Sequence, residues 1–194
     1  MDLQLAKEFG IKKMTFDCEE ELRKIHQYFP EAECVIRIAT ESTTALYNLS
    51  EKFGASMEEV PELLATVKKL GLRLKGVAFH TGSGGVTFIS YEMSLKNVRK
   101  IFDMVLDMSM EPLDLVDIGG GFTMVAVEKE KNFEYVAPLI SQTINKIFPE
   151  SNIRFIAEPG RYISESCVYH ASTIIGTKQM KSGHRHYYID SGIF

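Results

Sequence analysis

The sequence predicts an α/β fold made of consecutive strand–helix units, corresponding to part of a parallel α/β barrel. Short apolar runs end near Ile38, Phe79, Ile118 and Ala157, at intervals of about 40 residues, as repeated βα units give. Between them, apolar residues recur with helical spacing. The carboxyl ends of parallel barrel strands share one face, and that face holds the active site, so we expect the residues that follow these runs to converge.

Five barrel-type strands are expected, around Phe16, Ile36, Phe79, Ile118 and Ile156. Helices are expected over residues 1–9, 19–28, 56–70, 90–107 and about 136–147, because each carries an apolar stripe. The helix expected over residues 56–70 should begin with a capping box of Ser56 and Glu59 and end at Gly71.

The period changes after Arg161. Residues 167–176 and 186–190 predict strands of an antiparallel unit, because no helix separates them. We therefore expect two domains, over residues 1–163 and 164–194. A closed barrel of this kind has eight strands, so the chain is expected to be an interior piece with strands four to eight and the start of a C-terminal β domain.

Composition favours a globular chain of 194 residues, with 45% hydrophobic and 25% charged residues. The net charge of −4 and the lack of a long apolar run give no reason to expect nucleic acid or a membrane as partner. Three cysteines without C-x-x-C spacing favour a reduced, cytoplasmic location. His184 and His186 lack further ligands nearby, so no metal is expected.

Two opposite charges, Glu158 and Arg161, follow the strand predicted over residues 153–157. An exposed ion pair, which contributes little to stability, is one explanation. The other is a functional pair at the strand end, and the spacing alone leaves both open.

Three consecutive glycines, Gly119, Gly120 and Gly121, follow another strand. They would let the backbone approach a ligand closely and direct N–H groups toward an anion. Arg161 could add a bidentate contact and Ser83 a hydroxyl, which together predict a phosphate site. A tight turn with no ligand is the alternative for the glycines by themselves.

Glu158 would repel a phosphate, so we expect it to face another part of the ligand. A pyridine nitrogen suits a carboxylate, which keeps that nitrogen protonated and makes the ring an electron sink. His80 could lie flat against such a ring, although a lone histidine at a strand end is more often structural. The spacing does not name the cofactor.

Several motifs in series resemble one family. They are Phe79-His80-Thr81-Gly82-Ser83-Gly84, Asp117-Ile118-Gly119-Gly120-Gly121-Phe122 and Ala157-Glu158-Pro159-Gly160-Arg161-Tyr162, with Met14-Thr15-Phe16-Asp17, Arg37-Ile38-Ala39-Thr40, Lys52-Phe53-Gly54-Ala55 and Ile101-Phe102-Asp103-Met104. Their order and wording are similar to those of the ornithine decarboxylases, within the barrel-fold pyridoxal-phosphate (PLP) decarboxylases. The resemblance covers nearly the whole chain.

The resemblance implies roles for particular residues. His80 is similar to the histidine stacked on the cofactor ring, and Glu158 to the carboxylate on the pyridine nitrogen; these two are the candidate catalytic residues. Cofactor-binding residues implied by the motifs are Arg37, His80, Ser83, Gly119, Gly120, Gly121, Glu158, Pro159, Gly160 and Arg161. Lys52 resembles a lysine that pairs across the dimer interface, or is an exposed loop charge.

The implied activity is decarboxylation of L-ornithine, or a similar basic amino acid, to putrescine in polyamine biosynthesis by a homodimer. The glutamate favours a decarboxylase over the racemases that share the barrel. The family's Tyr-Ala-Val-Lys-like segment, which carries the lysine that forms the Schiff base with the cofactor, is not present. Residues 190–194 also differ from the family's sequence motif. The isolated chain is therefore expected to be inactive, and ornithine, lysine and arginine remain open as substrates.

An alternative function is that of a catalytically inactive homologue resembling antizyme inhibitor. Residues 1–22 correspond to the region that engages antizyme in animal enzymes, with basic residues at Lys7, Lys12, Lys13, Arg23 and Lys24 in or beside it. A solvated basic surface is the competing explanation.

Overall fold

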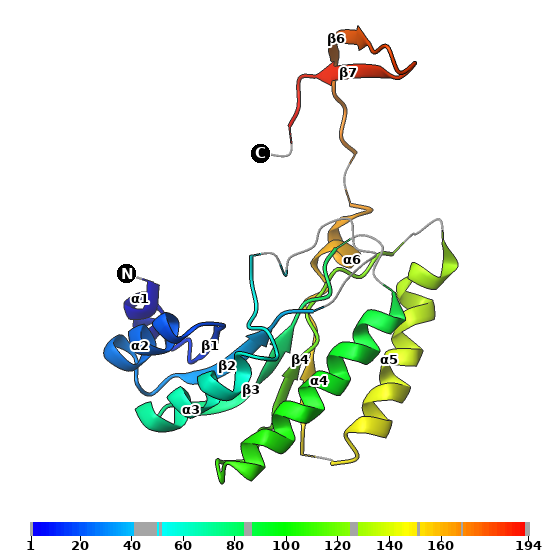
Figure 1. Cartoon of the computed structure of the whole chain (residues 1–194). Helices are drawn as coiled ribbons and strands as arrows, with labels where there is room; N and C mark the ends of the chain where they lie inside the picture. The colour runs from blue at the N-terminus through cyan, green and yellow to red at the C-terminus, as the bar shows by residue number, and fades with distance from the viewer. Residues whose placement is uncertain are drawn as a thin grey trace.

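The computed structural model describes residues 2–40, 50, 52–83, 87–124, 128–150, 152–167 and 169–192. Within them lie a five-stranded sheet in the order β1-β2-β3-β4-β5 and a two-stranded sheet of β6 and β7 (Figure 1). The strands of the larger sheet are β1 (Lys13–Phe16), β2 (Glu33–Ile38), β3 (Arg73–Phe79), β4 (Leu115–Asp117) and β5 (Arg154–Ile156). The helices are α1 (Asp2–Glu8), α2 (Glu19–Tyr28), α3 (Val60–Leu70), α4 (Phe88–Asp107), α5 (Phe133–Ile147) and α6 (Gly160–Ser164), with a 3₁₀ turn, η2, at Lys129–Lys131.

All four pairings in the larger sheet are parallel, and each strand pairs with the next one in sequence. The predicted repeat of parallel strand–helix units is therefore confirmed, although α1 precedes the first strand. The numbering of these strands as four to eight of a barrel, and a domain division after residue 163, stay predictions.

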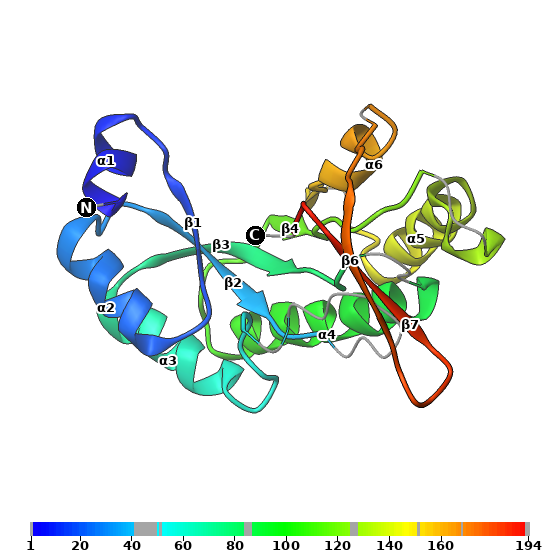
Figure 2. The same ribbon diagram turned by 90° about the horizontal axis from the view of Figure 1, so that it is seen from above.

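The two faces of the larger sheet bury different rows of side chains. Ile36, Val77 and Val116 are in register and fully buried in the main core, against which α2 to α5 pack. The next row alternates to the opposite face, as strand geometry requires. A smaller cluster of Val35, Ala78 and Leu115 lies on that face. Figure 2 shows the strands rotated relative to one another, with α4 running beneath them.

The ends of α3 follow the predicted signals. Ser56 N–H donates to Glu59 Oε2 at 2.8 Å, and Glu59 N–H donates to Ser56 Oγ at 3.3 Å, which is the reciprocal capping box. Regular helix begins at Val60, a turn later than predicted. Gly71 ends the helix with a φ of 65°, a left-handed conformation that glycine adopts without penalty.

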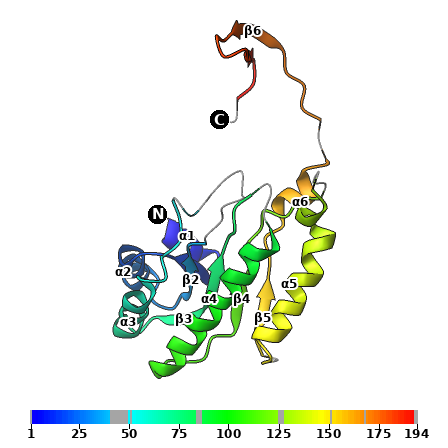
Figure 3. The same ribbon diagram turned by 45° about the vertical axis from the view of Figure 1, so that its right-hand side comes forward.

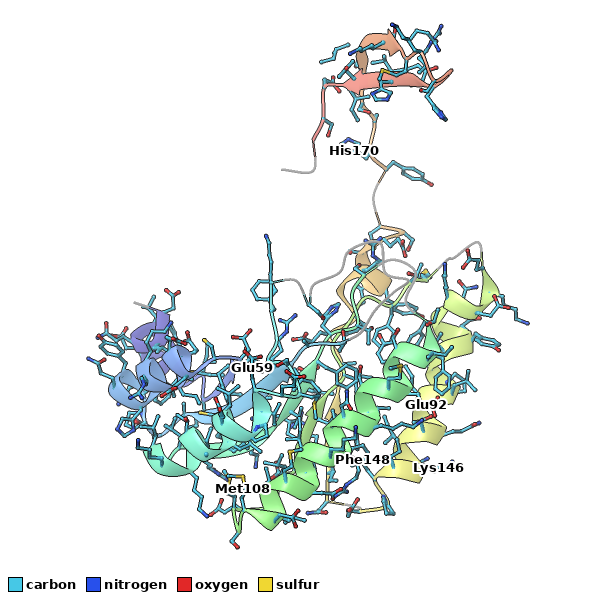
Figure 4. The ribbon with its side chains drawn as sticks, viewed as in Figure 1. Glu59, Glu92, Met108, Lys146, Phe148 and His170 are labelled. Atoms are coloured by element: carbon cyan, nitrogen blue, oxygen red, sulfur yellow. The ribbon has the colours of Figure 1, made fainter. Side chains whose placement is uncertain are left out.

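The second sheet is a hairpin of β6 (Ile174–Gln179) and β7 (Arg185–Ile189), paired antiparallel. Figures 1 and 3 show it standing away from the larger sheet, and Figure 4 places His170 on the segment that leads to it. The antiparallel unit was predicted, but a strand from Cys167 was wrong. Within the described residues, pairing with β7 begins at Ile174, and residues 169–173 belong to no strand.

Helix α6 is a second departure from prediction. Pro159 and Gly160 indicated only a stop after the preceding strand, whereas a short helix begins at Gly160. Pro159 is its N-cap, and Ser164 Oγ donates back to the Gly160 carbonyl at 3.0 Å. A proline is tolerated at a helix start because its missing N–H would have no partner there.

Candidate functional site

The glycine run at the end of β4 packs directly against the end of β3. A Cβ added to Gly119 would lie 2.3 Å from the Phe79 carbonyl oxygen, and one added to Gly121 would lie 1.9 Å from that of Gly82. Gly119 and Gly121 also have φ values of 67° and 87°. No amino acid other than glycine tolerates both this backbone conformation and so close a neighbour, so glycine is required at both positions for the loops to meet.

Gly120 lies between the two candidate catalytic residues. A Cβ on Gly120 would lie 2.2 Å from the Glu158 carbonyl oxygen and 3.5 Å from His80 Nε2. The end of β5 is held there by a hydrogen bond from Glu158 N–H to the Gly119 carbonyl, at 2.8 Å. The predicted convergence of His80, the glycine run and Glu158 is therefore present, with Glu158 exposed at the mouth.

Arg161 lies one turn beyond Glu158, in α6. Its Nε donates to Ser83 Oγ at 2.8 Å, although 78 residues separate the two. Its terminal nitrogen pairs with Glu165 at 3.4 Å, whereas no ion pair joins it to Glu158 among the described residues. The surface ion-pair explanation of Glu158 and Arg161 is therefore wrong. Arg161 and Ser83, both assigned to one phosphate site from the sequence, lie in direct contact, and their binding of a phosphate stays a prediction.

Pro159 and Gly160 form the turn that carries the chain from Glu158 to Arg161. Gly160 N–H donates to the Glu158 carbonyl at 2.8 Å, and Pro159 caps α6. These two residues set the direction of α6 and thereby bring Arg161 to Ser83.

Backbone donors lie beside this pair. Within the described residues, the N–H groups of Gly120 and Gly121 have no hydrogen-bond partner, and both residues are buried. Buried N–H groups are nearly always bonded, so free donors next to a guanidinium indicate a place for an anion. This observation goes beyond the tight-turn explanation of the glycine run.

His80 is fixed by its neighbours in one orientation. Its Nδ1 accepts a hydrogen bond from Gly82 N–H at 3.1 Å, and its carbonyl accepts one from Thr40 Oγ1 at 3.0 Å. The neutral ring therefore carries its proton on Nε2, the nitrogen that faces Gly120. Burial lowers the pKa of His80, the positive charge of Arg37 lowers it further, and the Glu158 carboxylate opposes both.

Arg37 lies at the end of β2, on the sheet face opposite the helices, in register with Ala78. Its guanidinium lies over the Phe53 ring, 5.1 Å from the centroid, and its charge acts on the pKa of both His80 and Asp117. The structure thus places Arg37 beside the site, as predicted. Lys52 is exposed, and its predicted pairing across a dimer stays a prediction.

Asp117 belongs to the same row and was not singled out from the sequence. It is in register with Ala78, and its Oδ1 accepts the Gly119 N–H at 2.9 Å. Burial raises the pKa of Asp117, Glu158 raises it further, and the Gly119 hydrogen bond and Arg37 oppose this. Asp117 lies two repeats after Arg37, and this spacing between charged residues at strand ends was the available signal.

A comparison with protein families and curated proteins identifies the chain. Residues 1–165 match the family described as "Pyridoxal-dependent decarboxylase, pyridoxal binding domain". The chain belongs to this family. It is 36% identical to a decarboxylase, flvG, of Aspergillus flavus, over 100% of the chain and 45% of that protein. It is 34% identical to an ornithine decarboxylase of Saccharomyces cerevisiae, over 99% of the chain and 40% of that protein.

Among solved structures, the arginine decarboxylase of Paramecium bursaria Chlorella virus, bound to agmatine, superposes with a TM-score of 0.82. It is 32% identical, over 97% of this chain and 50% of that one. The chain therefore spans half the length, or less, of these relatives.

The cofactor of the family is PLP, and the residues present fit it. An anion site with two free N–H groups and a guanidinium suits its phosphate, and a carboxylate across Gly120 suits its ring nitrogen. Among the described residues no cluster of metal-ligating side chains is found. No helix in the described part of the chain combines the length and apolarity needed to cross a bilayer.

Proposed function

We propose that this chain forms the phosphate- and ring-binding half of the active site of a PLP-dependent decarboxylase that converts L-ornithine to putrescine. The observation that carries the proposal is the contact between Arg161 and Ser83 beside the free N–H groups of Gly120 and Gly121. The carboxylate of Glu158 lies on the other side of that run.

The anionic end of the cofactor would be held by three kinds of donor. The Arg161 guanidinium supplies charge, the Ser83 hydroxyl a neutral donor, and the glycine N–H groups fixed dipoles. Charge-assisted hydrogen bonds are about twice as strong as neutral ones, so Arg161 is expected to contribute most to phosphate affinity.

The ring end would be held by the two candidate catalytic residues. When bound, PLP supplies a ring that accepts the electron pair left behind when a substrate carboxylate departs as carbon dioxide. The Glu158 carboxylate holds a proton on the ring nitrogen, which strengthens that acceptor. His80, neutral and fixed through Nδ1, provides a flat surface for the ring.

The choice of ornithine rests on the similarity to the yeast ornithine decarboxylase, while the viral relative is named for arginine. A cytoplasmic homodimer, with sites completed by the partner and a role in polyamine biosynthesis, is part of the same proposal. We also propose that the 194-residue chain alone is inactive, because no segment here resembles the one that carries the cofactor-attaching lysine.

The antizyme-inhibitor alternative gains no support from the basic residues near the N-terminus. Lys7 pairs with Glu31, Lys13 with Glu33, Arg23 with Glu19 and Lys24 with Glu21. Their charges are therefore largely balanced on the surface, as the solvated-face explanation expects. Antizyme binding stays a prediction.

The phosphate site is tested by equilibrium dialysis of the purified chain with pyridoxine 5′-phosphate and with pyridoxine. Neither probe has the aldehyde that would react with surface lysines. Arg161→Ala should weaken binding of the phosphorylated probe by about tenfold or more, and leave pyridoxine binding unchanged.

The matched control is Arg154→Ala, an exposed arginine at the opposite end of β5, which should change neither affinity. An Arg161→Ala chain that prefers the phosphorylated probe as strongly as the wild-type chain does would contradict the proposal. Carbon dioxide release from ornithine, lysine and arginine, with PLP added, should not exceed that of the heat-denatured chain. Release above that level would contradict the proposed inactivity.

A further inference from the structure

Tyr91 lies behind the glycine run, on the side of the helices. It belongs to the first turn of α4, and its side chain is 1% exposed. Its ring stacks on Phe122 with centroids 5.4 Å apart and 5° between planes, and it meets Phe79 edge to face at 6.2 Å. The ring is thus held by the residues on either side of the site loops.

The Tyr91 hydroxyl reaches the backbone of the glycine run. It donates a hydrogen bond of 3.0 Å to the Gly120 carbonyl, and this contact is buried. Burial raises the pKa of Tyr91, and the nearby Thr81 hydroxyl opposes the rise, so the hydroxyl keeps its proton and remains a donor.

The Gly120 carbonyl and the Gly121 N–H belong to one peptide unit. That unit is trans, so its two polar groups point in opposite directions. Because the carbonyl points to Tyr91 in the helix layer, the Gly121 N–H points away from it, toward the mouth where Arg161 meets Ser83. A peptide between two glycines can otherwise rotate readily, since both residues accept positive φ values.

We propose that Tyr91 is a positioning residue, whose hydroxyl holds the Gly120–Gly121 peptide so that the Gly121 N–H faces the phosphate of the ligand. The hydrogen bond to the carbonyl also polarises the peptide and makes its N–H a better donor. This inference rests on the proposed function and adds a residue to the same site.

Tyr91→Phe removes the hydroxyl and keeps the ring between Phe79 and Phe122. We expect its affinity for pyridoxine 5′-phosphate to fall about twofold to tenfold, the range for loss of one hydrogen bond. Competition by inorganic phosphate should weaken by a similar factor, and pyridoxine affinity should stay unchanged. Tyr135→Phe, at an exposed tyrosine of α5, is the matched control and should change none of the three.

If the role of Tyr91 were purely structural, Tyr91→Phe would lower the melting temperature and would either weaken the binding of both probes equally or change the binding of neither. Either binding result would overturn the proposal. If wild-type chain itself shows no preference for the phosphorylated probe, the proposed function and the role of Tyr91 both fail. A wild-type preference that Tyr91→Phe leaves intact overturns only the role of Tyr91.

A second measurement needs no variant. The carbonyl ¹³C resonance of Gly120 in the ligand-free wild-type chain should lie downfield, as it does for a hydrogen-bonded carbonyl. A resonance at the position of a free carbonyl would overturn the proposal.

Discussion

The two ends of the five-stranded sheet use charge in opposite ways. At the amino ends of the strands, Glu33 pairs with Arg73 at 3.0 Å and with Lys13 at 3.4 Å, and Lys75 pairs with Asp114. Each of these five charges has an opposite charge beside it. These pairs link neighbouring strands and leave little charge for a ligand.

At the carboxyl ends the charges are not neutralised in this way. Among the described residues, neither Arg37 nor Glu158 has an ion-pair partner, and Arg161 pairs only with Glu165, the C-cap of its own helix. Close packing of glycine backbone joins the strand ends instead. The comparison shows that, in the described part of the chain, one end of the sheet neutralises its charges in pairs, whereas the other leaves Arg37 and Glu158 unpaired.

The largest expected effect comes from filling the close contact at the site end. Gly121→Ala would place Cβ 1.9 Å from the Gly82 carbonyl, at a φ of 87°. We expect a loss of about 3 kcal/mol or more in the free energy of unfolding, because backbone strain and a clash combine. Urea denaturation measures it.

Gly71→Ala is the control at the other end of the sheet. Gly71 has a φ of 65° but no atom within 4 Å of the added Cβ, so only the conformational cost of about 1 kcal/mol remains. Equal losses in the two variants would show that the contact with Gly82 does not matter.

A smaller difference is expected between two glutamates. Glu33→Gln removes the shared carboxylate of two ion pairs, and should lower the free energy of unfolding by about 1 kcal/mol or less. Glu158→Gln should not lower it, since the carboxylate has no cation to lose and its charge disfavours ionised Asp117. Destabilisation by Glu158→Gln as large as that by Glu33→Gln would remove the distinction between the two ends.

The smallest effect concerns pH. The pKa of His80 is lowered from its ordinary value of 6.5, so below that pH the unfolded chain binds a proton that the folded chain resists. Stability is therefore kept above pH 6.5 and lost as pH falls through it.

The free energy of unfolding of wild-type chain should fall more steeply than that of His80→Asn between about pH 7.5 and about pH 5.5. Asp117 has the opposite sign but is present in both proteins, so it cancels in the difference. If the free energies of unfolding of the two proteins changed with pH in parallel, burial would not be lowering the pKa of His80.

Much of the site could be predicted because it depends on local sequence. Strand ends are marked by apolar runs that stop, so His80, the glycine run and Glu158 were located from spacing alone. Residue type then assigned Ser83 and Arg161 to one phosphate site, and the family motifs implied the same roles. These assignments depend only on where strands end, and the fold places all such ends on one face.

The rest depends on contacts between distant segments. Tyr91 falls in the apolar stripe of a helix and reads as core, because its hydroxyl acquires a role only when the Gly120 carbonyl, 29 residues later, is placed against it. Helix α6 has five residues, too few for a helical period to be recognised. The start of β6 is set by its partner strand, which local sequence does not reveal.

Strand β5 is an edge of the larger sheet, yet Glu158 follows directly from it. A backbone hydrogen bond from Glu158 N–H to the Gly119 carbonyl ties the end of this edge strand to the glycine run. Fraying at this margin would therefore carry the carboxylate away from the glycine run. Conversely, a further strand paired with β5 would remove that edge and hold the Glu158 carboxylate beside the glycine run without contacting the site itself.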